Sequence, residues 1–175
     1  MPRPPQPDLS RLTPFDAHPA VVGLVPGLPD LVALTAVAWA RATGATLYFA
    51  YADPMRYAVA ERPDGSVRHA GVDQDASNDW EQRAAELEAY LHTTVSPTGV
   101  PWEFRYLAGR ADRALTHLAR AVDAAVIVVG TGTPGLRGGL RRLVNGSVAA
   151  HLSHHQHRPV LSVPLRVVDW KDKIE

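Results

Sequence analysis

The chain has 175 residues, of which 46% are hydrophobic and 21% charged, and it contains no cysteine. This composition predicts one soluble globular domain, and the lack of cysteine excludes disulfides, thiolate zinc sites and cysteine nucleophiles. Basic and acidic residues number 18 each, so net charge favours neither nucleic acid nor a membrane as partner, and no apolar stretch reaches the ~18 residues of a membrane span.

The two ends of the chain differ from the rest. Residues 1–18 are proline-rich and lack an apolar signal core, so we expect a disordered tail and a cytoplasmic protein. Residues 167–175 form a polar C-terminal tail. Between the tails, residues 19–166 show no internal repeat and predict a single α/β domain.

The start of this domain predicts a strand, a helix and a second strand. An apolar run at 20–25 is followed by a helix at 31–42, which Asp30 can cap and Gly44 ends. The side chains expected to face the core from this helix are Leu31, Leu34, Val37, Ala38 and Trp39. A β-rich run at 46–52 then completes a unit of the size of one parallel crossover.

A β-hairpin is expected next, outside the main sheet. Alternating runs at 57–61 and 66–70 flank Arg62-Pro63-Asp64-Gly65, and Pro-Asp-Gly is a strong turn signal. This hairpin is either a lid or a surface for a partner, and the pattern does not decide between the two. A helix at 79–93, a strand at 101–107 and a helix at 111–121 follow.

The last unit begins with an unbroken apolar run at 125–129, which predicts a strand buried on both faces. A glycine-rich loop, a helix at 148–157 and a strand at 160–163 follow. The whole pattern predicts an α/β fold, with an open, doubly wound, five-stranded parallel sheet, helices on both faces and an inserted hairpin near 57–70. A glycine loop before a helix N-terminus is also suited to binding an anion.

At Gly132-x-x-Gly135 and Gly146-Ser147 the sequence resembles the universal stress protein (UspA-like) family. ATP-binding members carry a strand, a Gly-x2-Gly-x9-Gly-Ser/Thr signature, a helix and a final strand. Here ten residues, not nine, separate Gly135 from Gly146. The resemblance covers about 20–164 and implies a Rossmann-like fold of the adenine nucleotide alpha hydrolase type and a role in the stress response.

The resemblance also implies a binding site for an adenine nucleotide, with ATP and Mg²⁺ as the expected ligands. The backbone of Tyr51 would contact adenine, and a second set would surround ribose and phosphates: Gly130, Gly132, Gly135, Gly146, Ser147 and Val148. From charge alone we add Arg137 as a phosphate partner. Val25 stands where ATP-binding relatives usually carry an Asp.

Two functions stay open. One is a nucleotide-binding regulatory module, with slow ATP hydrolysis at most, because no general base or metal-binding carboxylate is arranged near the loop. The other is a nucleotide-independent protein-interaction module with a vestigial pocket. In either case a homodimer through the edge strand Val160–Val163 is expected from the resemblance.

Other sites are weaker interpretations. The chain has no lysine before Lys171, so a Walker-type phosphate loop is absent, and so is the Gly-x-Ser-x-Gly of serine hydrolases. His151, His154 and His155 have a spacing that zinc can use, but histidines also suit a helix C-terminus. We therefore predict no metal site and no catalytic residues.

Overall fold

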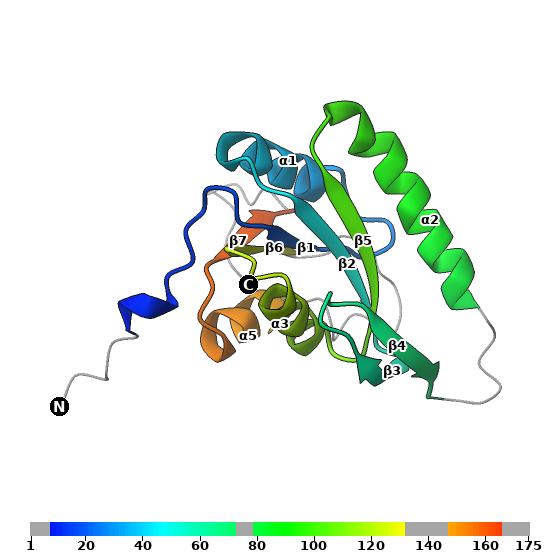
Figure 1. Cartoon of the computed structure of the whole chain (residues 1–175). Coiled ribbons are helices and arrows are strands. Elements are labelled where there is room, and N and C mark those ends of the chain that lie inside the picture. The colour runs from blue at the N-terminus through cyan, green and yellow to red at the C-terminus, as the bar shows by residue number, and fades with distance from the viewer. Residues whose placement is uncertain (1–7, 73–78, 132–146, 166–175) are drawn as a thin grey trace, which may run out of the picture.

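Five parallel strands form the central sheet of the computed structural model, which describes residues 8–72, 79–131 and 147–165 (Figure 1). The strand order is β5-β2-β1-β6-β7. The strands are β1 (Ala20–Gly23), β2 (Leu47–Asp53), β5 (Trp102–Ala108), β6 (Val126–Thr131) and β7 (Val160–Pro164). The predicted doubly wound sheet is confirmed, although β1 ends two residues before the end of the apolar run.

Helices cover both faces of this sheet (Figure 1). One face carries α1 (Leu31–Thr43) and α2 (Asp79–Thr94), and the other carries α3 (Ala111–Ala121) and α5 (Ser147–His155). Along β1, Val22 packs with the α1/α2 core and Val21 with the α3/α5 core. Because successive strand residues point to opposite faces, a sheet covered on both sides requires strands that are apolar throughout.

Two short 3-10 turns complete the inventory, η1 (Leu9–Arg11) before β1 and η2 (Ser96–Thr98) after α2. Gly44 ends α1 as predicted, with φ +71°. Within the described ranges, no helix combines the length and the apolar character that a bilayer crossing requires.

Helix α1 buries a different stripe from the one predicted. Its buried residues are Val32, Ala33, Ala36, Val37 and Ala40. Leu31 and Leu34 are instead 51% and 44% exposed, and of the five predicted residues only Val37 is fully buried. The small side chains let α1 approach the sheet closely, to the point that a Cβ on Gly130 of β6 would lie 3.1 Å from Val32 Cγ2.

The predicted cap of α1 is also wrong. Asp30 has helical backbone angles and its side chain makes no capping hydrogen bond. Its carboxylate instead lies close enough to the Tyr90 hydroxyl on α2 to affect the ionisation of that group. Burial, and then this carboxylate, raise the pKa of Tyr90 to about 12. The Asp30 side chain therefore lies near α2, a proximity that no local pattern could reveal.

The predicted hairpin is confirmed as a separate two-stranded antiparallel sheet of β3 (Arg56–Glu61) and β4 (Val67–Gly71). The Asp64 carboxylate accepts hydrogen bonds from the N–H and hydroxyl of Ser66, at 2.9 and 2.7 Å. Gly65 has φ +79°, and a Cβ there would lie 2.3 Å from Leu118 Cδ1 of α3. The turn therefore packs directly on α3.

An aromatic cluster of His69, Trp80 and Tyr106 fixes the hairpin to α2 and β5. Their ring centroids lie 4.7 Å (His69–Trp80), 5.3 Å (His69–Tyr106) and 5.6 Å (Trp80–Tyr106) apart. Arg56 Nε donates to His69 Nδ1 at 2.7 Å. Burial, and then this guanidinium, lower the pKa of His69, so the ring is held neutral as the acceptor.

Candidate functional site

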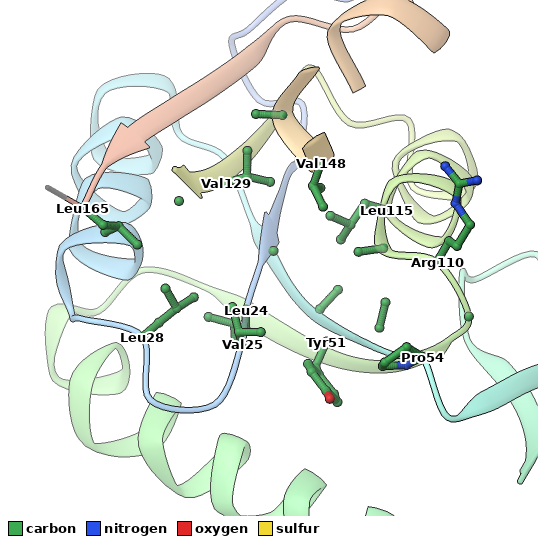
Figure 2. Close-up of a pocket in the computed structure, with 17 residues that line it drawn as sticks. Leu24, Val25, Leu28, Tyr51, Pro54, Arg110, Leu115, Val129, Val148 and Leu165 are labelled. Carbon is green, nitrogen blue, oxygen red and sulfur yellow. The ribbon is translucent and has the colours of Figure 1, made fainter. Parts of the chain in front are cut away.

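A cavity lies at the carboxyl ends of β1, β2 and β6 (Figure 2). The strand order reverses here, because β2 pairs with one edge of β1 and β6 with the other. The two connections leave the sheet in opposite directions at such a switch point and open a crevice, which is where ligands bind in open α/β sheets.

The walls of this cavity are mostly apolar and come from six segments of the chain. The β1–α1 connection supplies Leu24, Val25 and Leu28, and β2 and the residue after it supply Tyr51 and Pro54. The remaining labelled residues in Figure 2 are Arg110, Leu115, Val129, Val148 and Leu165. Among the described residues, the lining includes no carboxylate and no histidine. The cavity therefore suits an uncharged, flat group better than a charged one.

Two helices begin at the cavity. Ala111, the first residue of α3, lines it, as does Val148 at the start of α5. The first N–H groups of a helix have no partner within the helix, and its N-terminus carries a partial positive charge. No side chain caps α3 at its N-cap residue, Arg110. The mouth of the cavity thus offers backbone donors to an anion.

Three of the predicted site residues line the cavity, namely Tyr51, Gly130 and Val148. Ser147 is the first residue of α5, directly before Val148. The other predicted site residues lie outside the described residues: Gly132, Gly135, Arg137 and Gly146.

The Tyr51 side chain is buried on the α1/α2 face of the sheet, 6% exposed, with its ring 5.4 Å from that of Tyr106. Burial, and then the nearby Asp53, raise its pKa. Its neighbours Ala50 and Ala52 point to the opposite face, where α3 packs. Two small side chains there leave the backbone of β2 accessible from the cavity.

Gly130 and Val25 each affect the shape or polarity of the cavity, Gly130 because it has no side chain and Val25 because its side chain is apolar. A Cβ on Gly130 would lie 2.8 Å from Leu165 Cδ1, so this glycine is required first for packing. Val25 lines the cavity, and its side chain has no hydrogen-bonding group. The wall on the β1 side is therefore apolar where ATP-binding relatives usually have a carboxylate.

Asp53, at the end of β2, is a polar anchor that the sequence reasoning missed. It is 3% exposed. Its carboxylate accepts hydrogen bonds from Tyr106 Oη (2.6 Å), Arg83 Nη1 (3.0 Å) and the Met55 N–H (2.9 Å). It therefore joins β2, β5, α2 and the start of the hairpin beside the cavity. An Asp-Pro pair directly after a buried strand was the available signal.

Arg110 is the charged side chain of the described lining. It pairs with Asp112 through Nε–Oδ1 (3.1 Å) and Nη2–Oδ2 (2.7 Å). Burial opposes ionisation of Asp112, but Arg110 and the Arg113 N–H outweigh it and lower the pKa of this carboxyl. The pair stays ionised at neutral pH, at the point where α3 meets the cavity.

The described part of the cavity lining offers groups suited to binding. Tyr51 and Arg110 are the titratable side chains of the described lining, and neither is placed as a general base. Across the described ranges, no group of three or more His, Asp or Glu side chains could hold a metal ion.

Comparisons with known proteins agree on the family. The universal stress protein family matches residues 29–164. No curated protein sequence matches the chain.

Solved structures share the fold. The universal stress protein from Archaeoglobus fulgidus is 21% identical with a TM-score of 0.60, and the match covers 83% of this chain and 98% of that one. The universal stress protein from Archaeoglobus fulgidus in complex with dAMP is 20% identical with a TM-score of 0.58, and the match covers 83% of this chain and 97% of that one. A universal stress protein in complex with cAMP is 23% identical with a TM-score of 0.52, and the match covers 86% of this chain and 100% of that one. The family match spans most of the chain and the fold agrees, so this chain belongs to the universal stress protein family.

Proposed function

We propose that this protein binds an adenine nucleotide in the cavity at the ends of β1, β2 and β6 and acts as a regulatory module in the stress response. The observation that carries the proposal is the position of the cavity, at the switch point of the sheet and at the N-termini of α3 and α5. Two proteins of the same fold were solved with dAMP and with cAMP.

The described residues suit the two ends of such a ligand differently. The apolar walls between Val25, Leu115 and Val129 suit the flat base, with the Tyr51 backbone supplying its hydrogen bonds. The phosphates would lie toward the N-terminus of α5, at Ser147 and Val148.

From the sequence signature, Gly132, Gly135, Gly146 and Arg137 would complete the phosphate site. Phosphate oxygens bound there would also be the ligands of any Mg²⁺ that enters with ATP.

A second candidate function is favoured by the apolar wall at Val25. In that case the cavity takes no nucleotide and the protein works as a protein-interaction module. Both candidates are compatible with a homodimer through β7, which is an edge strand of the sheet. Sedimentation velocity at tens of micromolar tests the dimer, and a monomer there would contradict it.

Calorimetric titration with AMP and ATP separates the two functions. We expect the wild-type chain to bind both, and Ala149→Trp to abolish binding because Ala149 lines the cavity at the start of α5. The matched control is Ala150→Trp, on the next, exposed residue of the same helix. Thermal unfolding establishes that both variants are folded.

Each result has a definite reading. No heat with wild type at millimolar nucleotide would refute nucleotide binding and support the interaction module. Equal binding by both tryptophan variants would show that a nucleotide binds elsewhere.

A further inference from the structure

A second depression, the α3–α5 groove, runs between these two helices on the outer face of their layer. It has a volume of about 560 Å³ and is lined by the N-cap residue Arg110, by Arg113, His117 and Arg120 of α3, and by His151 and His155 of α5. This volume is within the roughly 300–1,000 Å³ of small-ligand sites. Arg110 lines both the cavity and the groove, so the groove starts at the mouth of the cavity.

The groove carries an excess of positive charge. Its carboxylate is Asp112, which already pairs with Arg110. Arg113 and Arg120 are exposed and form no ion pair with any described residue. From Arg110 to Arg120, the cations follow about 15 Å of helix. Two guanidinium groups are thus available to a ligand, while His117 is paired with Glu61 of β3 at 3.1 Å.

The far end of the groove shows the effect of this charge on a neighbour. The pKa of His157 is lowered by burial, and then by Arg158, Arg11 and Arg120, against the opposite effect of Asp123. Arg11 of η1 and Arg120 of α3 therefore lie near His157, beside Arg158, which is paired with Asp123 at 3.4 Å. A positive potential of this extent attracts anions rather than neutral ligands.

The lining also restricts the kind of anion. None of the described residues that line the groove is aliphatic, so an acidic peptide would find no apolar contact for its side chains. The only rings are imidazoles, with those of His151 and His155 stacked 5.7 Å apart, so single-stranded nucleic acid would lack its usual stacking platform. Guanidinium groups match phosphate oxygens in two-pronged hydrogen bonds.

We propose that the α3–α5 groove is a binding site for a phosphate chain, held by Arg113 and Arg120 with the exposed His155 as a further donor. The site goes beyond the proposed nucleotide site and does not depend on it, because its residues other than Arg110 do not line the cavity.

Titration of the full chain with inorganic tripolyphosphate tests the proposal. We expect binding that weakens steeply with added salt, and a loss of affinity of roughly fivefold or more for Arg113→Gln and for Arg120→Gln. The control is Arg41→Gln, which removes one cation from α1 on the opposite face of the sheet. Thermal unfolding checks that each variant is folded.

The source of the phosphate chain is resolved by two further titrations. If tripolyphosphate still binds with AMP present, and Ala149→Trp leaves it unchanged, the groove takes a free chain. If the two compete, and Arg113→Gln weakens ATP but not AMP, the groove takes the tail of a nucleotide. Either result supports the proposal. Failure of AMP to bind would contradict the proposed nucleotide site but not the groove site, because the two have separate linings apart from Arg110.

The proposal is overturned if wild type does not bind tripolyphosphate at millimolar concentration. It is equally overturned if Arg41→Gln loses as much affinity as the two groove variants, because binding would then reflect total charge.

Discussion

The packing of the hairpin turn on α3 predicts that Gly65→Ala destabilises the protein by two separable effects. The φ of +79° is unfavourable for a residue with a side chain and costs about 1–2 kcal/mol. The new Cβ would also lie 2.3 Å from Cδ1 of Leu118, which is 0% exposed and packed in the α3/α5 core. Such overpacking costs about 1–3 kcal/mol, so the free energy of unfolding should fall by about 2–5 kcal/mol.

Gly99→Ala isolates the steric effect. Gly99 has nearly the same φ, +74°, but a Cβ there meets nothing within 4 Å. Both substitutions lower the entropy of the unfolded chain equally, so that effect cancels in the comparison. Urea denaturation of both variants should give a difference of about 1–3 kcal/mol. Equal losses would refute the packing of the hairpin on α3 and make the hairpin a peripheral excursion.

Three further predictions concern single side chains, Tyr106, Tyr90 and Val25. Tyr106→Phe removes the 2.6 Å hydrogen bond to Asp53 and should lower the free energy of unfolding by about 1–3 kcal/mol in urea denaturation; no change would contradict the anchoring role. Tyr90, whose pKa is raised from 10.0 to about 12, stabilises the fold below pH 10, and this contribution is lost as pH rises through about 12; Tyr90→Phe should therefore unfold less steeply in alkali. Val25→Asp places a carboxylate in the cavity wall and should raise AMP affinity about tenfold by calorimetry, and an unchanged affinity would argue against a nucleotide there.

The apolar cavity and the charged α3–α5 groove meet at Arg110. Arg110 lies at their junction and is held by Asp112, while the hairpin contacts the middle of α3 through Gly65 and through the Glu61–His117 pair at 3.1 Å. The hairpin does not line the cavity, so the lid interpretation has no support from the described residues.

Local sequence patterns were sufficient for the elements and their order. The β-branched run of β6 predicts a strand covered on both faces, Gly44 predicts the end of α1, and Pro63-Asp64-Gly65 predicts the hairpin turn. Each of these signals depends on the conformational preferences of a few adjacent residues. The glycine signature likewise indicated the universal stress protein family, which the family match confirms.

Only the tertiary structure decided which groups meet. Helical spacing alone predicted that Leu31 and Leu34 face the core. Because α1 lies close to the sheet, the stripe that contains Ala33, Ala36 and Ala40 is buried instead, and both leucines are exposed. Asp53 becomes buried because Arg83 and Tyr106, from distant segments, arrive to satisfy its carboxylate. Burial of a charge and the lining of a groove depend on contacts between residues far apart in the chain, and local periodicity contains no information about those contacts.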